Sequence, residues 1–125
     1  MPGVTMDAGG LIALDRNDRR VVVLLARARE TGARATVPAT ILAQAIRKPD
    51  CQVRLSRLIR QPTTDVIELG RVDATNVGRL LAASGTSDIA DAHLVICARR
   101  ANQPVITSDP GDLRQLDPNL QLIVL

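Results

Sequence analysis

An α/β fold in three layers, with helices on both faces of a mainly parallel sheet of four to five short strands, is the fold class that this sequence predicts. Short apolar runs alternate along the whole chain with longer segments of helical periodicity. Consecutive strands are therefore separated by helices, which requires parallel pairing through right-handed crossovers. At 125 residues the chain has the length of one domain, spanning residues 1–125, and can bury a sizeable core.

Five short apolar runs have the length of strands. The first is followed by Asp7, Ala8 and two glycines, and the second is stopped by Pro38. The predicted strands are residues 4–6, 35–37, 64–69, 105–107 and 121–124.

The segments between these strands carry the periodicity and the end signals of helices. Val22, Leu25 and Ala26 share one face of the second predicted helix, and Gly32 is placed to end it. Pro38 suits the first turn of the next helix. The predicted helices are residues 9–14, 19–29, 39–47, 51–60, 73–83, a helix capped by Ser87 or Asp88 that runs through Ala101, and a short helix that starts at Asp109-Pro110.

The composition excludes some functions and favours others. The chain has no Phe, Trp or Tyr, so it lacks the aromatic platforms on which many single-strand nucleic-acid binders stack bases, and an RRM or OB-fold is disfavoured. Of its 16 Lys and Arg residues only Lys48 is a lysine. A net charge of +3 and a pI near 9.6 suit a polyanionic partner, because Arg forks match phosphate oxygens. A GC-rich coding sequence explains the Arg excess equally well.

The two cysteines, Cys51 and Cys97, are isolated thiols without metal-ligand spacing, and Cys97 in its apolar helical run is expected to be a small buried side chain. No apolar run approaches the roughly 18 residues of a membrane span, and no signal peptide is visible. We therefore expect no membrane association and a location in a reducing cytoplasm.

Five aspartates gather at the predicted carboxyl edge of the sheet. Asp7 ends the first strand, Asp109 follows the fourth, and Asp91 begins the helix that packs beside them. Asp88 and Asp112 stand three residues from two of these acids. Helix capping explains each position taken singly, but it does not explain the shared location, and like charges held together repel. The set therefore favours a divalent metal site.

The donor types select a hard cation. Mg²⁺ or Mn²⁺ prefers oxygen ligands and keeps several waters, so a few carboxylates suffice, whereas no set of His and Cys is present to suit zinc. His93 is the only histidine, and we expect it to be packed or solvated and not to act as a base or ligand. A phosphodiester can bind such a metal while water attacks in line. The residues thus predict metal-dependent phosphodiester hydrolysis.

Four segments, taken together and in order over nearly the whole chain, resemble the PIN domain, the metal-dependent ribonuclease fold of VapC-type toxins. The segments are Val4–Ala8, Val37–Gln44, Asp91–Ala98 and Val105–Asp109. The resemblance implies that Asp7, Asp91 and Asp109 are catalytic and hold Mg²⁺ or Mn²⁺. It also places Asp88 and Asp112 beside them as further metal-binding residues.

The resemblance carries further expectations. Thr107 or Ser108 is expected to hydrogen-bond an acid or a water on the metal. Members of this kind cut RNA, often form homodimers, and are inhibited by a small antitoxin whose C-terminal segment lies in the active-site groove. The chain is accordingly expected to be the toxin of a type II toxin–antitoxin pair. Arg47, Arg99 and Arg100 are the candidate RNA-binding residues.

Two positions depart from the family pattern. Gln44 stands where the family usually has Glu, so it offers a carbonyl oxygen but no charge, and Gly9 stands where a small hydroxyl or amide residue often follows the first Asp. We hypothesise that Asp88 restores the missing negative charge. The alternative that Gln44 supports is a catalytically weak or inactive PIN-like domain that binds RNA or a protein.

Phosphotransfer folds with an Asp nucleophile fit less well. Haloacid-dehalogenase-like enzymes need a second Asp two residues after the first, where this chain has Gly9. Response-regulator receivers need a late Lys, and the only lysine is Lys48. The glycine-rich motifs of nucleotide-binding folds are also missing.

Overall fold

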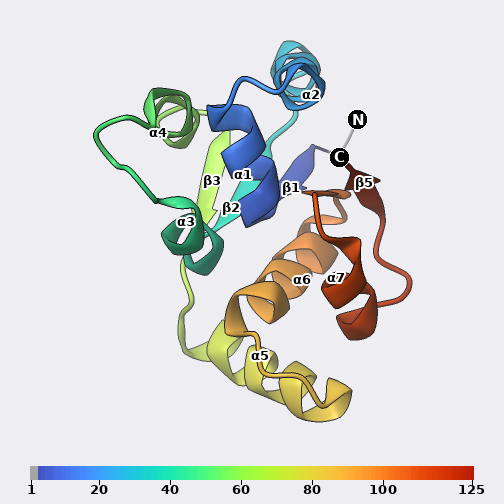
Figure 1. The fold of residues 1–125 in the computed structure, drawn as a ribbon. Helices are drawn as coiled ribbons and strands as arrows, with labels where there is room; N and C mark the ends of the chain where they lie inside the picture. Colours follow the sequence, from blue (N-terminus) through green and yellow to red (C-terminus); the bar gives the residue numbers. More distant parts are fainter. Residues whose placement is uncertain (1–2) are drawn as a thin grey trace.

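A five-stranded, all-parallel sheet lies at the centre of the molecule, with the strand order β3-β2-β1-β4-β5 (Figure 1). The computed structural model describes residues 3–125. The strands are β1 Val4–Met6, β2 Ala35–Pro38, β3 Thr64–Ile67, β4 Val105–Thr107 and β5 Leu122–Val124. All four pairings are parallel, as crossover connections require. The α/β class predicted from the alternating pattern is confirmed.

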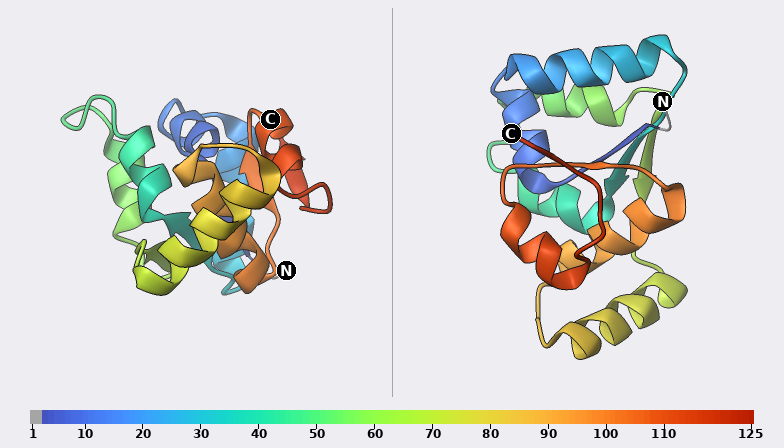
Figure 2. Two further views of the ribbon diagram at one scale, coloured as in Figure 1. Left: turned by 90° about the horizontal axis from the view of Figure 1, so that it is seen from below. Right: turned by 90° about the vertical axis from the view of Figure 1, so that its right-hand side faces the viewer.

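Helices cover both faces of this sheet. The helices are α1 Ala8–Asp15, α2 Arg19–Glu30, α3 Ala39–Ala45, α4 Val53–Ile59, α5 Arg71–Ser84, α6 Ile89–Ala101 and α7 Pro110–Leu116. α1, α2 and α4 lie on one side, and α6 and α7 lie on the other (Figure 1). α5 packs on the outer side of α6, away from the strands, as both views of Figure 2 show. None of the helices within residues 3–125 is long and apolar enough to cross a membrane.

The helix boundaries agree with the predicted ones to within two residues, and the early end of α3 has a local cause. The helix predicted to reach Arg47 ends at Ala45, where the side chain of Gln52 takes over the backbone groups. Gln52 donates to the carbonyl of Ala45 at 2.9 Å and accepts from the amide of Arg47 at 2.8 Å. Gly32 follows the C-cap of α2 with a left-handed φ of 72°, a conformation that glycine adopts without strain.

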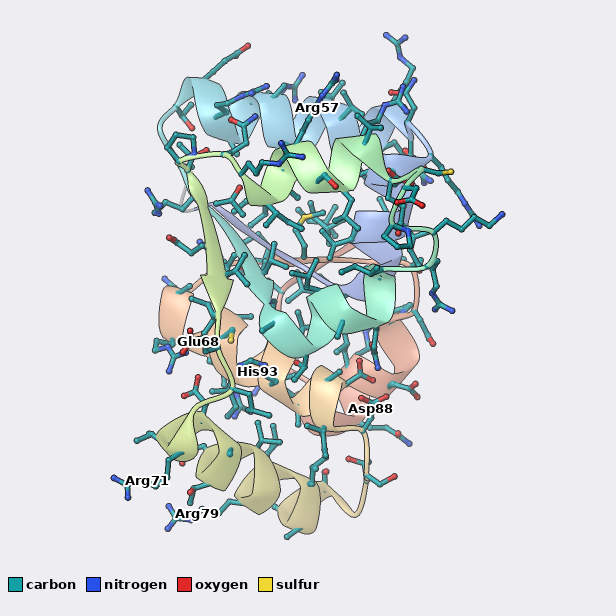
Figure 3. All side chains as sticks on the ribbon, turned by 90° about the vertical axis from the view of Figure 1, so that its left-hand side faces the viewer. Arg57, Glu68, Arg71, Arg79, Asp88 and His93 are labelled. Carbon is teal, nitrogen blue, oxygen red and sulfur yellow. The ribbon has the colours of Figure 1, made fainter. Side chains whose placement is uncertain are left out.

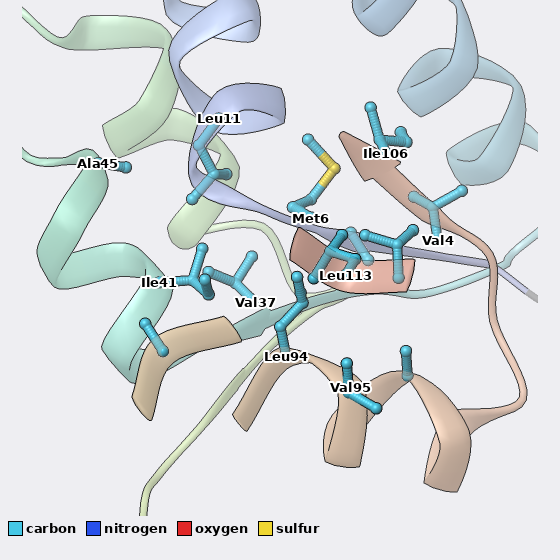
Figure 4. Close-up of a cluster of buried hydrophobic side chains, with 14 of the residues drawn as sticks. Val4, Met6, Leu11, Val37, Ile41, Ala45, Leu94, Val95, Ile106 and Leu113 are labelled. Carbon is cyan, nitrogen blue, oxygen red and sulfur yellow. The ribbon is translucent and has the colours of Figure 1, made fainter. Parts of the chain in front are cut away.

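The core is built entirely from aliphatic side chains and one thioether. Met6 of β1, Ile106 of β4 and Leu94 of α6 are fully buried between the layers (Figure 4). Each such side chain contributes on the order of 1.5–3 kcal/mol by leaving water. Leu11 of α1 and Ile41 of α3 join the same cluster. The ends of β1 and β4, and the start of α6, are thereby held beside one another.

Candidate metal centre

The carboxyl edge of the sheet brings the predicted acids together. Asp7 follows β1 and Asp109 lies two residues beyond β4, and these two strands are neighbours that pair Met6 with Ile106. Asp91 lies in the first turn of α6, which packs against β1 and β2. Residues that are up to 102 positions apart in the chain thus share one edge because the strands are parallel.

Asp7 is the most firmly held of these acids. It is buried, and its Oδ1 accepts a 2.7 Å hydrogen bond from the amide of Gly10 as the N-cap of α1. Burial raises its pKa, a hydrogen bond from the Thr107 hydroxyl lowers it, and the negative charge of Asp109 raises it. The Thr107 oxygen also accepts from the amide of Asp109 at 3.0 Å. Thr107, fully buried at the end of β4, therefore positions both neighbouring acids.

The pKa of Asp91 is raised by all four of the other acids. Its carboxyl is half-buried, and burial is the largest cause that raises its pKa, to about 6. The negative charges of Asp88, Asp112, Asp7 and Asp109, in decreasing order, raise the pKa further. The other four acids are therefore near enough to Asp91 for their charges to act on it, and all five share this edge of the sheet.

None of the five acids forms an ion pair with a cationic side chain of residues 3–125. Within residues 3–125 the aspartates that form ion pairs with Arg are Asp18, Asp65, Asp73 and Asp117, all outside the cluster. Without a cation, the negative charges of the acids repel one another and lower the stability of the fold. The pKa of Asp91, raised to about 6, reflects this repulsion together with burial. The donors are all hard oxygens, and the acids other than Asp7 are exposed or partly exposed, so the residues present fit a divalent cation such as Mg²⁺ or Mn²⁺.

Helix capping accounts for two of the five acids but not for the others. Asp88 caps α6 by accepting a 2.9 Å hydrogen bond from the amide of Asp91, and Asp7 caps α1. Asp109 occupies the N-cap position of α7 before Pro110, yet its side chain makes no capping hydrogen bond. Its carboxylate, exposed at the edge, is left for another partner.

Gly9 and Gly10, in the first turn of α1, permit a close approach of that helix to the chain after β4. A Cβ on Gly10 would lie 2.9 Å from the backbone oxygen of Ile106, and a Cβ on Gly9 would clash with the Ser108 hydroxyl. The missing side chains let α1 begin against the end of β4 and let the Ser108 hydroxyl occupy the space beside position 9. A Gly-Gly pair two residues after a strand-terminal Asp is a signal for such a close approach.

The remaining predicted site residues divide into two groups. Gln44 is exposed on α3, one turn after Thr40, whose hydroxyl contacts His93 of α6 at 2.8 Å. Arg47 is exposed just beyond α3. The helix that carries Gln44, α3, packs against both α1 and α6.

Arg99 and Arg100 lie at the far end of α6 from Asp91 and are already paired. Arg99 binds Asp117 at 2.9 Å, and Arg100 binds Asp73 through two hydrogen bonds of 2.8 and 2.9 Å. The structure does not bring these two arginines to the acids.

Comparisons with known proteins support the fold. A chain of the VapBC2 complex from Rickettsia felis, solved with a DNA fragment from its promoter, superimposes with a TM-score of 0.66 at 14% identity, over 98% of this chain and 98% of that chain. A chain of FitAcB from Neisseria gonorrhoeae gives a TM-score of 0.62 at 15% identity, over 96% of each chain. No family model and no curated protein matches the sequence.

These findings correct the family assignment suggested by the four sequence segments. The assignment to PIN domains of the VapC type was wrong. The similar structures are chains of the VapBC2 and FitAcB assemblies, and no family model matches the chain. At 14 and 15% identity the likeness establishes the α/β fold alone. The case for a function therefore rests on the acid cluster itself.

Proposed function

We propose that this chain is a Mg²⁺- or Mn²⁺-dependent endoribonuclease that acts as the nuclease of a toxin–antitoxin pair in the cytoplasm. The observation that carries the proposal is the gathering of Asp7, Asp88, Asp91, Asp109 and Asp112 at one edge of the sheet, where none of them forms an ion pair within the described residues 3–125. Chains of the same fold occur in VapBC2 and FitAcB, and this supports the toxin–antitoxin context.

The proposed roles follow from how each acid is held. Asp7 and Asp91 would hold the ion, Asp7 fixed by its hydrogen bonds with Gly10 and Thr107, and Asp91 carried by the first turn of α6. Asp109, free of capping duty, completes the set. When bound, the ion supplies positive charge for a phosphodiester oxygen and makes water more acidic. Asp88, with one oxygen committed to the α6 amide, and Asp112 bind ordered water around the site.

RNA as the substrate is proposed from charge and from the position of Arg47. The chain has a net charge of +3, and Arg47 is the predicted RNA-binding arginine that has no acid partner among residues 3–125. A guanidinium group at the end of α3 suits a phosphate of the RNA backbone.

A partner protein is proposed to dock in the apolar groove between α2 and α4. The groove has a volume of about 380 Å³ and is lined by Val22, Leu25 and Leu58, with Arg29 and Arg57 at its sides. An amphipathic helix with acidic flanks, supplied by a small antitoxin, matches both the apolar floor and the positive rim. Self-association into a homodimer stays a prediction that a molar-mass measurement in solution can check.

The test is cleavage of single-stranded RNA by the purified chain. Cleavage is expected with Mg²⁺ or Mn²⁺, to be stopped by EDTA, and to be lost in Asp7→Asn, whose amide oxygen can still cap α1. Asp50→Asn, in the exposed loop after α3, is the matched control and should keep full activity. Cleavage that needs no metal and survives Asp7→Asn would overturn the proposal.

A second candidate, a non-catalytic module that binds RNA or a protein, is favoured by one observation. Gln44, exposed on α3, carries no charge with which to support a metal or activate water. Titration with Mn²⁺ discriminates between the two. No binding at millimolar Mn²⁺, together with intact RNA or partner binding, would favour the module.

A further inference from the structure

A second cluster of ligating side chains lies where α5 meets α6, apart from the carboxyl-edge acids. One ligand atom from each of Asp73, His93 and Cys97 lies within 4.8 Å of the other two, and all three residues are buried. His93 and Cys97 are four residues apart on α6 and so share a face of that helix, while Asp73 comes from the first turn of α5. Figure 3 shows His93 between α6 and the chain around Glu68.

His93 is oriented as metal-binding histidines are. Its Nδ1 is fixed by the Thr40 hydroxyl at 2.8 Å, and the side chain is 0% exposed. Its Nε2 lies 3.8 Å from Oδ2 of Asp73, and a hydrogen bond with the backbone of Glu68 raises the pKa of the ring. One ring nitrogen is thus held by a hydroxyl while the other faces the Asp73 carboxylate, and a metal bound there would replace the contact with Glu68.

We propose that Asp73, His93 and Cys97 form a Zn²⁺ site that fastens α5 to α6. An imidazole, a thiolate and a carboxylate form the mixed donor set that borderline-soft Zn²⁺ prefers, with a water as fourth ligand. Tetrahedral zinc needs ligand atoms about 3.3–3.8 Å apart, so the three side chains must close by roughly 1 Å. On binding, the Cys97 sulfur forms the metal bond and its proton passes to solvent.

Arg100 has to shift for this site to form. Its guanidinium binds both oxygens of Asp73 and also the Cys97 side chain, which it must release to a metal. A carboxylate offers about four lone-pair positions, so Oδ2 of Asp73 retains one for a metal on the His93 side. The Arg100 side chain is 54% exposed and can also move outward. Cys97 and Arg100 line a cavity of about 330 Å³, which gives an ion a route from solvent to the sulfur.

The probe is Co²⁺, which gives a thiolate-to-metal absorption band in the near ultraviolet when sulfur is a ligand. The full-length chain, stripped with EDTA and held in excess Mg²⁺ to occupy the hard carboxylate site, is titrated with Co²⁺. The proposal expects a band that saturates at one equivalent and is removed by Zn²⁺. The band should vanish in Cys97→Ser and persist in Cys51→Ser, which alters the exposed thiol.

Two further variants make the test decisive. Thr40→Val removes the hydroxyl that orients His93, and should weaken Co²⁺ binding about 10- to 100-fold while leaving the thiol in place. Asp91→Asn should leave the band unchanged, so this site is tested independently of the proposed nuclease. Absence of the band in the wild-type protein, or a band that survives Cys97→Ser and is lost in Cys51→Ser, would overturn the proposal.

Discussion

The two ends of α6 hold carboxylates in opposite electrostatic states. Near its start, Asp91 is surrounded by four other aspartates and its pKa is raised to about 6. Near its end, Arg100 binds Asp73 of α5, and this hydrogen-bonded pair lowers the pKa of that carboxyl. An ionised aspartate therefore destabilises the fold at the start of α6 and stabilises it at the end of α6. An acid whose charge the fold leaves unbalanced is the one available to an external cation.

The largest expected effect is on catalysis at the unbalanced end. Asp91→Asn should lower Mn²⁺-dependent RNA cleavage by at least about 100-fold, because it removes a proposed ligand and not merely a residue behind one. Initial rates on single-stranded RNA measure this. The proposed difference between the two ends of α6 would be wrong if Asp91→Asn cleaved RNA as fast as the wild-type chain while Asp73→Asn, remote from the five acids, cleaved more slowly.

The same substitution should change stability in opposite directions at the two ends. In metal-free buffer near pH 7.5, Asp73→Asn should lower the free energy of unfolding by about 1–2 kcal/mol, since it breaks the pair with Arg100. Asp91→Asn should raise it by roughly 1 kcal/mol, since it removes a repelled charge. Urea denaturation in EDTA measures both. Two destabilising results would show that the acid cluster is not under repulsion.

The pH dependence of stability follows from the two pKa directions. The pKa of Asp91 is higher in the folded chain than its ordinary 3.8, so its ionisation reduces stability as pH rises from about 4 to about 6. The pKa of Asp73 is lower in the folded chain, so its contribution is complete above 3.8 and is lost as pH falls further. Metal binding reverses the first effect, because the ion binds the ionised carboxylate.

Mn²⁺ affinity should therefore fall by up to about tenfold for each pH unit below about 6, and should be flat above about pH 7. Calorimetric titration across this range measures it. Asp88 is the largest source of charge that raises the pKa of Asp91, so Asp88→Asn should shift the onset of the loss to lower pH. If Asp88→Asn leaves the pH dependence of Mn²⁺ affinity unchanged, Asp88 does not raise the pKa of Asp91, and the two acids are not close neighbours.

The sequence predicted the parts of the molecule that follow from periodicity. The alternation of apolar runs and helical segments predicted all five strands, and the parallel pairing placed Asp7, Asp91 and Asp109 at one edge. Arg99 and Arg100 were predicted to bind RNA, which requires that no acid of the protein already pairs with them. The periodicity of a sequence does not predict which acids of other elements lie beside the end of α6. Both arginines instead bind Asp117 and Asp73.

Contacts between helices were beyond the sequence reasoning. Cys97 was expected to be a small buried apolar side chain, and it is buried, but it lies beside Arg100, Asp73 and His93. The four-residue spacing of His93 and Cys97 was visible in the sequence. Their third partner comes from α5, and the packing of α5 against α6 is a tertiary feature that local pattern does not encode.

The smallest effect concerns Gln44, and it tests whether the cluster is short of one charge. α3 packs along α6, and Gln44 lies one turn beyond the Thr40–His93 contact. Gln44→Glu should tighten Mn²⁺ binding two- to fivefold, as one added exposed charge contributes about 0.2–1 kcal/mol. It should also lower metal-free stability, since it adds to the repulsion.

Asp88→Ala should do the reverse, weakening Mn²⁺ binding, and Gln44→Glu should restore the loss in the double variant. If Asp88→Ala leaves Mn²⁺ binding and cleavage intact, Asp88 does not compensate for the neutral Gln44, and the other four acids suffice.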